Sequence, residues 1–548
     1  MSLGRYLVSG FISQSILFSA SVKVSHFQPD PVGSPVMMNF AASWQDPEEI
    51  ARNFISSQTN QLGYISAYVS EAYDTQDLSL ERIEEQNNAT HVIFQQELDG
   101  IPVFGQQLKV HLRGDQSVLL MNGQYVNLED TVIRNTRGIT SEQAKVISRR
   151  NFKLDAATEA MVDEVFIPNE NSLVRGYKIL FIVPGRGELV ALVDVTKGTI
   201  LRSYNQVLDT PRHKGPTQQS AGLERELAKF RKTKGPQALQ KSSSRRISKD
   251  EKTPQGWIHS SSFKTQPEIQ TVELKALKDD SKLCGEAVSL INKKEDRAVS
   301  EDGQFLFTPE STHYDEVMVY YHITEMTAYL KSIGVDLNLK KPTVATVHYN
   351  DDDNSFYSPA RKELFFGDGG VPDSADADII LHEFGHAIVD HLSGLEGGWG
   401  SQGSAMHEGY GDYVAASFFN DPEIGEWDSS AYTEDGFLRN VNNQKKFPDD
   451  MTHNGHDDGE IWSGTLWDLY QTVGKDVSDR LVYHSLRFLP QDANFRDGLV
   501  AILSAEETLF KGKFKKAAIK VFEKRGIKLE EQGEKDVQQA RFNDLYTE

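Results

Sequence analysis

Two histidines and a glutamate in residues 381–387 (LHEFGHA) have the types and spacing of a metal site. On an α-helix, residues four apart share a face, so His382 and His386 can bind one metal ion. Glu383 follows the first ligand and can reach a water molecule bound to that metal, from which it would take a proton. The chain contains 15 histidines, so a chance match is the alternative, and the third ligand must come from elsewhere.

Residues 407–413 (HEGYGDY) offer that third ligand, because a catalytic zinc ion needs three protein ligands and one open position. Glu408 follows His386 after enough chain for a loop and a returning helix. Asp412 is one turn further on the same face, where it can accept a hydrogen bond from a zinc histidine and fix its tautomer. His407 is the competing ligand, and a solvated acidic helix face is the bland alternative.

Two helices would position these groups. Apolar residues cover the other faces of the first one, and the second spans about residues 405–419. Before them, residues 314–333 (YDEVMVYYHITEMTAYLKSI) have helical periodicity and Gly334 ends that helix. Strands are expected at 344–349, at the edge segment 354–357 and at 364–369, whereas the chain beyond 456 is largely helical.

The first 207 residues predict a different, strand-rich part. Helices are expected from residue 47 and at 140–152, the second one capped by Thr140 or Ser141. Strands are expected at 90–96, 101–104, 107–112, 117–121, 177–183, 188–194 and 199–204. Residues 208–255 are rich in Pro, Gly, Lys and Arg and poor in apolar residues, which is typical of a flexible, protease-sensitive linker.

Composition narrows the class of protein. A chain of 548 residues is long enough for two to four domains, and its 38% hydrophobic content is sufficient for packed cores. The net charge of −22 argues against a nucleic-acid partner or a polybasic membrane binder. A single cysteine, Cys284, excludes an internal disulfide and a cysteine-rich metal site.

The N-terminus resembles a secretory signal only in part. Arg5 precedes an apolar run, and small residues follow near position 20, but polar residues interrupt the run. Residues 1–25 are thus a candidate signal peptide with features for and against it, and a secreted, extracellular protein is the expectation. No later stretch has the apolar length of a membrane span.

The motifs HEFGH and EGYGD together resemble the gluzincin metallopeptidases of the thermolysin and fungalysin families. Residues 354–369 (NSFYSPARKELFFGDG) resemble their substrate-cleft edge strand, and residues 314–323 and 456–470 also match. Residues 90–112 (THVIFQQELDGIPVFGQQLKVHL) resemble the fungalysin/thermolysin propeptide motif, and the helix and strands of 138–207 resemble the PepSY domain. The resemblance covers most of residues 47–525.

This resemblance implies roles for further residues. The Asn354 side chain and the Ser355 backbone would bind a peptide substrate, and Arg439 would hold the carbonyl of the residue after the scissile bond. His456 would stabilise the transition-state oxyanion, with His453 as the alternative. An acid that orients His456 is also expected, and the candidates are Asp449, Asp450, Asp457 and Asp458. Residues 399–403 (WGSQG) contain no tyrosine, which puts a tyrosine oxyanion donor in doubt.

The resemblance also suggests a calcium site. Its candidate ligands are Asp378, Asp421, Glu423 and Glu426, because clustered carboxylates with flexible spacing suit calcium. One acid expected near Phe419 is missing, so an acidic surface loop is the alternative.

These observations predict an α+β precursor. Its parts are a propeptide unit at 45–127, a PepSY-like unit at 138–207, a linker at 208–255 with the processing site, and a two-lobed catalytic domain at 256–548. The lobes would be β-rich and then α-helical. The expected function is zinc-dependent hydrolysis of internal peptide bonds by a monomer with one catalytic zinc ion. Its partners would be protein or peptide substrates and its own pro-region. An inactive peptide-binding relative and a zinc aminopeptidase are the alternatives.

Overall fold

The computed structural model describes residues 46–61, 75–209, 253–259 and 269–529, apart from short gaps at 87, 127, 129–130, 135–137, 170–171, 184–185, 399 and 430–435. Two compact units make up the chain, Met1–Tyr204 and Asn205–Glu548. Helices and sheets occur in both, which confirms the α+β class. The expected signal peptide and residues 210–252 of the expected linker lie outside the described residues.

The first unit is built on one mixed sheet. Its elements are α1 (Pro47–Gln61), η2 (Thr75–Asp77), β1 (Leu78–Gln86), β2 (Ala89–Leu98), β3 (Ile101–Arg113), β4 (Val118–Gly123), β5 (Val132–Arg134), α2 (Ser141–Phe152), β6 (Met161–Asn169), β7 (Ser172–Val183), β8 (Gly187–Asp194) and β9 (Ile200–Asn205). The strand order is β1-β2-β3-β6-β7-β8-β9, with β4 paired to β3 and β5 paired to β7.

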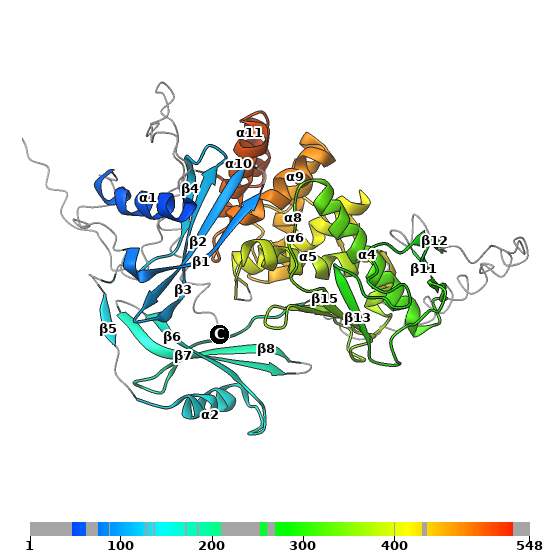
Figure 1. Ribbon diagram of the computed structural model, residues 1–548, viewed down its shortest axis with the longest axis horizontal. Coiled ribbons are helices and arrows are strands. Elements are labelled where there is room, and N and C mark those ends of the chain that lie inside the picture. Colours follow the sequence, from blue (N-terminus) through cyan, green and yellow to red (C-terminus); the bar gives the residue numbers. More distant parts are fainter. Residues whose placement is uncertain are drawn as a thin grey trace, which may run out of the picture. The chain divides into compact units, whose positions relative to one another are not determined.

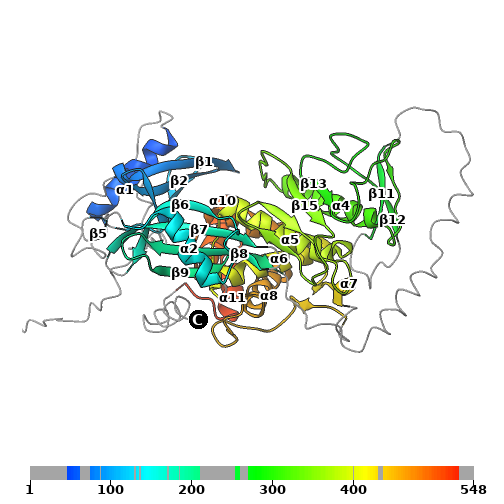
Figure 2. The same ribbon diagram turned by 90° about the horizontal axis from the view of Figure 1, so that it is seen from below.

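Each half of this sheet has its own core, and one pairing joins the halves. Phe94 and Val110 belong to the core under α1, whereas Ile179 belongs to the core under α2. Helix α2 lies across β7 and β8 (Figure 2). Val103 on β3 pairs in parallel with Phe166 on β6, so the two segments that the sequence separates as units share a single sheet.

The sequence predicts some helices and strands of this unit correctly and misses others. Thr140 caps α2 through a capping box with Gln143, as the sequence predicts. The two strands expected at 101–104 and 107–112 form one long strand, β3, which keeps its pairing with β2 through a register shift opposite Gln95–Glu97. Strands β1 and β6 were not predicted.

The second unit combines small sheets with a helical C-terminal region. Its strands are β10 (Leu208–Asp209), β11 (Gln255–Ile258), β12 (Gln270–Glu273), β13 (Val288–Asn292), β14 (Gln304–Phe305), β15 (Thr343–Val347), β16 (Phe356–Ser358), β17 (Glu363–Phe365), β18 (Glu423–Ile424) and β19 (Arg439–Asn440). Its helices are α4 (Thr312–Ser332), η4 (Asp373–Ala375), α5 (Ala377–Ser393), α6 (Gln402–Phe419), α7 (Glu426–Ser429), α8 (Gly455–Val473), α9 (Lys475–Ser485), η5 (Leu486–Phe488), α10 (Phe495–Phe510) and α11 (Lys515–Lys524).

The helices of this unit form the platform for the predicted site. Figure 1 shows α4 beside β13 and β15, and α5 beside α6, which in turn packs on α8. The largest sheet has the order β10-β16-β17-β15-β13, with β16 between β10 and β17. Among the described helices, none has both the length and the apolar character needed to cross a membrane.

The two ends of the expected linker form short strands, which the sequence did not predict. Leu208 and Asp209 form β10 and pair with Tyr357 and Phe356, and the other end enters strand β11. Proline, glycine and charge mark the middle of the segment, but two-residue strands carry no periodicity that a sequence could reveal.

Candidate metal centre

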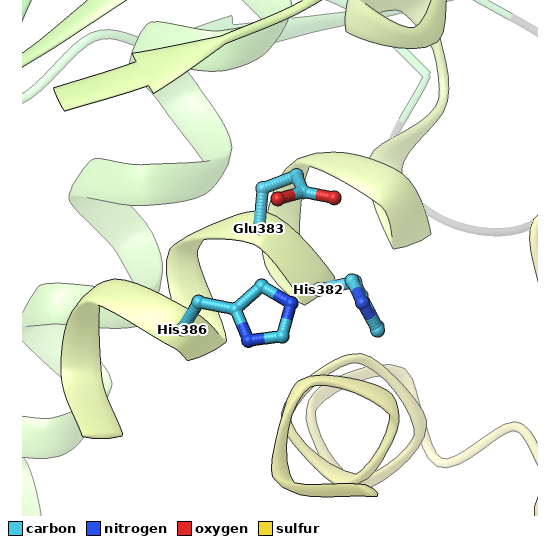
Figure 3. Close-up of side chains that lie close together, drawn as sticks. All are labelled: His382, Glu383 and His386. Atoms are coloured by element: carbon cyan, nitrogen blue, oxygen red, sulfur yellow. The ribbon is translucent and has the colours of Figure 1, made fainter. Parts of the chain in front are cut away.

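Helix α5 carries the H-E-x-x-H motif through the interior of the second unit. Asp376 caps its N-terminus, accepting a hydrogen bond from the Asp378 backbone N–H at 2.8 Å, and Gly394 ends it with φ of 64°. His382, Glu383 and His386 are all fully buried. Figure 3 shows the two imidazole rings next to each other, with the Glu383 carboxylate projecting from the same helix. The three offer ligand atoms within 4.8 Å of one another.

Helix α6 brings Glu408 to the two histidines. The Nε2 atom of His382 lies 3.3 Å from Glu408 Oε2, and the Nε2 atom of His386 lies 3.8 Å from Glu408 Oε1. Both Nε2 atoms and both Glu408 oxygens are buried without a hydrogen-bond partner among the described residues. Unpaired polar atoms that converge in this way are costly unless something binds them.

A zinc ion fits this donor set. Two ligands of a tetrahedral zinc ion, each about 2.0–2.1 Å from the metal, are about 3.3–3.4 Å apart. The observed separations of 3.3 and 3.8 Å are close to this value. Two imidazoles and one carboxylate are also the ligand types of a hydrolytic zinc site.

Asp412 contacts the ring nitrogen of His382 that faces away from Glu408, and Arg439 contacts Asp412. Asp412 Oδ1 is 3.0 Å from His382 Nδ1, and Arg439 donates to Asp412 from Nε at 3.0 Å and from Nη2 at 2.8 Å. Burial would lower the pKa of His382, but Asp412 and Glu408 outweigh it and raise that pKa to about 9. Surroundings that favour a proton on His382 also favour a metal cation in its place.

His407 and Glu408 are neighbours with different surroundings. The ring of His407 turns to the loop before α6, where its Nε2 lies 2.8 Å from the Leu395 carbonyl oxygen. Burial lowers the pKa of His407. Glu408, in contrast, faces both motif histidines, so the geometry favours Glu408 as the third ligand.

Helix α8 adds His456 from a third direction. Asn454 caps this helix, and His456 Nε2 lies 3.3 Å from Glu408 Oε2. Of the four acids considered as partners for this histidine, Asp458 instead accepts hydrogen bonds from the backbone N–H groups of Thr452 and His453. The acid that orients His456 therefore stays unassigned.

Glycines set the spacing between the three helices. A Cβ atom at Gly411 would lie 2.8 Å from His382 Nδ1, and one at Gly459 would lie 2.7 Å from the Glu408 Cβ. A Cβ atom at Gly385 would lie 2.8 Å from the Gly411 Cα. Since real Cβ atoms do not come so close, the small residues allow α5, α6 and α8 to hold the ligands at these distances.

Of the predicted substrate residues, Asn354 and Ser355 lie just before β16, and Arg439 lies on β19. Asn354 is buried and its Oδ1 atom has no hydrogen-bond partner in the described part of the chain. Ser355 is buried, and its hydroxyl donates to Asp373 Oδ2 at 2.5 Å. Arg439 has a buried Nη1 atom without a described partner, in addition to its contacts with Asp412.

The predicted calcium ligands are brought together only in part. Asp378 Oδ2 accepts a hydrogen bond from the Gly425 backbone at 3.2 Å, and Glu426 is buried beside it. Burial, and then the charge of Asp376, raise the pKa of Asp378 well above its ordinary value. Asp421 is used in a turn, where it accepts from the Glu423 backbone N–H at 3.1 Å.

A second acidic cluster was not predicted from the sequence. Asp353, Asp373 and Asp428 each offer a carboxylate oxygen within 4.8 Å of the others. The density of acids just before α5 was a signal, but their partners on two distant segments could not be identified from spacing alone.

Comparison with known proteins agrees with this site. The fungalysin/thermolysin propeptide motif matches residues 82–125, the thermolysin metallopeptidase catalytic domain matches 258–390, and the fungalysin metallopeptidase model matches 368–530. A zinc metalloproteinase of Listeria monocytogenes is 24% identical over 492 residues, which cover 82% of this chain and 88% of the relative.

Two further relatives have similar identity. The thermostable neutral protease NprT of Geobacillus stearothermophilus is 24% identical over 65% of this chain and 64% of its own length. Bacillolysin of Bacillus subtilis is 21% identical over 75% of this chain and 78% of its own length. Among solved structures, the YpeB C-terminal domain of Bacillus megaterium aligns with 30% of this chain and 65% of its own at 17% identity and a TM-score of 0.18, which says nothing about the fold.

Proposed function

The chain is a zinc metalloendopeptidase of the thermolysin and fungalysin type with a propeptide motif, and from this premise we propose how its residues divide the work. His382, His386 and Glu408 hold the zinc ion, and Glu383 is the general base. The convergence of four unpaired buried atoms from these three ligands is the observation that carries the assignment.

Glu383 moves the protons of hydrolysis. When bound, the zinc ion supplies Lewis acidity that lowers the pKa of water and polarises the peptide carbonyl. Glu383 takes one proton from water as the new C–O bond forms. It then gives that proton to the amine nitrogen as the C–N bond breaks, so that the carboxylate is regenerated.

Three polar groups around the ligands would hold the substrate and its developing charge. His456 donates a hydrogen bond to the oxyanion. Arg439 uses Nη1 for a substrate carbonyl, because its Nε and Nη2 atoms are already directed at Asp412. The Asn354 side chain and the Ser355 backbone bind the main chain of the peptide along β16.

The chain acts as a precursor that is activated by a cut in residues 208–255. Leu208 and Asp209 pair antiparallel with β16, so the main chain that enters the linker already follows the proposed substrate edge. The two lobes of the catalytic part are the sheets before α5 and the helices after it. The first unit would assist folding and block the cleft until the linker is cut.

Location and further ions complete the proposal. The enzyme would be secreted and extracellular, as thermolysin-family peptidases typically are, and would act as a monomer. The side chains of Asp378, Asp421, Glu423 and Glu426 would bind a calcium ion, supported by the neighbouring positions of Asp378 and Glu426.

A peptide assay and metal analysis test the function together. The substrate is an internally quenched peptide blocked at both ends, which an aminopeptidase cannot cut and an inactive relative can only bind. We expect one zinc ion per chain and cleavage inside the peptide that stops when zinc is removed and resumes when it is restored. Cleavage restricted to unblocked peptides, or zinc-loaded protein that stays inactive after its linker has been cut, would overturn the proposal.

A further inference from the structure

Three aspartates from separate segments meet close to the start of β16. Asp353 lies in the loop before β16, Asp373 begins η4, and Asp428 lies in α7. One carboxylate oxygen from each lies within 4.8 Å of those of the other two. These three residues, the three-aspartate cluster, share no member with the zinc ligands or with the predicted calcium set.

Asp428 shows that this cluster is more than a group of surface acids. Its side chain is only 3% exposed, and its buried Oδ1 atom has no hydrogen-bond partner among the described residues. Asp373 is equally buried, with 3% exposure. A buried carboxylate oxygen without a donor is unfavourable unless a cation or a proton satisfies it.

The charged groups that act on Asp428 are mostly acidic. The positive charge of Arg439 acts to lower the pKa of Asp428, but the Nε and Nη2 atoms of Arg439 donate to Asp412. Asp376 adds a further buried acid nearby, and its Oδ2 accepts from the Trp427 and Asp428 backbone N–H groups at 3.1 and 3.0 Å. Burial and then the charge of Asp428 raise the pKa of Asp373 well above its ordinary value.

We propose that Asp353, Asp373 and Asp428 bind a calcium ion, at a site additional to the zinc centre. Only oxygen ligands are present, as calcium prefers. Two oxygens bound on opposite sides of calcium are about 4.6–5.2 Å apart, because each Ca–O distance is about 2.3–2.6 Å. The three oxygens lie within 4.8 Å of one another, so one calcium ion can reach all of them. Three protein carboxylates favour calcium over magnesium, because magnesium usually keeps several waters and is bound through only one or two carboxylates.

The ion would connect the substrate edge to the metal-binding helix. Asp373 already accepts from the Ser355 hydroxyl at 2.5 Å, and α7 is fixed to the cap of α5 through Asp376. Binding would join the loop that carries Asn354 to both segments. This site depends only on the aspartates, and it would exist even if the proposed peptidase roles were wrong.

Calcium binding by the zinc-loaded full chain tests the proposal. Glu383→Gln is used as the background to prevent self-digestion, and calcium is measured by equilibrium dialysis together with the melting temperature. We expect calcium to raise the melting temperature of the background protein by about 5 °C. Asp428→Asn should lose one bound calcium ion per chain, or bind it at least about tenfold more weakly.

Two controls make the outcome specific. Asp421→Asn alters the predicted calcium set but not the three-aspartate cluster, so it should keep the calcium ion that Asp428→Asn loses. Without calcium, Asp428→Asn should melt at or above the temperature of the background protein, because one of several repelling buried charges is gone; with calcium the order should reverse. If Asp428→Asn does not fold, Asp353→Asn replaces it with the same expected loss.

Two results would overturn the site. One is a background protein whose melting temperature does not change up to about 5 mM calcium, the upper range for weak extracellular sites, since protons would then satisfy the cluster. The other is undiminished calcium binding by Asp428→Asn or its substitute.

Discussion

Glu383 differs from His382 and His386 in its proposed role, since it would act as a base rather than as a zinc ligand. Glu383→Gln keeps the shape of the side chain but removes its basicity. We expect zinc content to stay at the parent level and the rate of peptide cleavage to fall by at least about a hundredfold, the usual scale for a general base. Metal analysis and the blocked-peptide assay measure both. Cleavage near the parent rate would mean that another group takes the proton.

Glu408 and His407 give a matched pair of substitutions at adjacent positions. Glu408→Ala removes the carboxylate that faces both motif histidines, so zinc content should fall strongly. His407→Ala removes a ring that contacts the Leu395 carbonyl, so zinc content should be retained. Equal loss of zinc in both variants, or loss only in His407→Ala, would show that Glu408 is not the third ligand.

Helical spacing explains which site residues were predictable. His382 and His386, and likewise Glu408 and Asp412, are four apart on helices, so their shared faces follow from the sequence. The contact between Arg439 and Asp412 joins a short strand to a helix, and no periodic rule predicts it. The three-aspartate cluster was missed for the same reason, since loop, η4 and α7 meet only through tertiary packing.

At the scale of elements, strand β15 leads into a buried charge network. His348 Nδ1 is 2.7 Å from Asp368 Oδ1, and its Nε2 is 3.6 Å from Asp315, while Lys294 pairs with Asp368 at 2.6 Å. Burial would lower the pKa of His348, but Asp368 and Asp315 outweigh it and raise that pKa above its ordinary value. The charged histidine therefore stabilises the fold.

This network predicts a pH-dependent stability. A raised folded-state pKa means that the contribution is complete below the unfolded pKa of about 6.5 and is lost as pH rises through the higher folded value. His348→Gln should lower the free energy of unfolding by about 1–3 kcal/mol at pH 6.5 and by clearly less at pH 9. Denaturant unfolding in the Glu383→Gln background measures this difference.

The pKa of Asp315, a neighbouring acid, decides which pH values can be compared. Burial raises the pKa of Asp315 to about 6, so its charge changes mainly below the chosen range. A cost for His348→Gln that is the same at both pH values would show that the histidine contributes through packing and not through its charge.

Element prediction succeeded where the signals were local. Caps and apolar periodicity gave α2, α4 and α6 to within a few residues, because these signals lie within single helices. Strand β3 was predicted as two strands, at 101–104 and 107–112. The strand continues between them, and it pairs with β2 on both sides of a register shift that only the partner strand reveals. Short strands such as β10 depend on partners far along the chain.

At the scale of the whole molecule, the position of the cut distinguishes a precursor from a permanent assembly. Residues 208–255 are rich in Lys, Arg, Gly and Pro, a composition typical of segments that proteases cut, so we expect the mature chain to begin between about residues 208 and 260. N-terminal sequencing of the parent and of Glu383→Gln measures this. An uncut variant beside a cut parent means self-processing. Active parent protein that keeps residues 47–207 covalently attached would make the first unit a permanent accessory domain.

The glycine contacts between α5, α6 and α8 affect how divergence in this group should be interpreted. Drift that replaced Gly411 or Gly459 would force the helices apart while leaving H-E-x-x-H and the downstream glutamate intact. Such a descendant would pass a motif search and still be a pseudoenzyme, free to evolve as a binding protein. Surveys that distinguish active peptidases from inactive relatives should therefore examine these glycines as well as the zinc-binding residues.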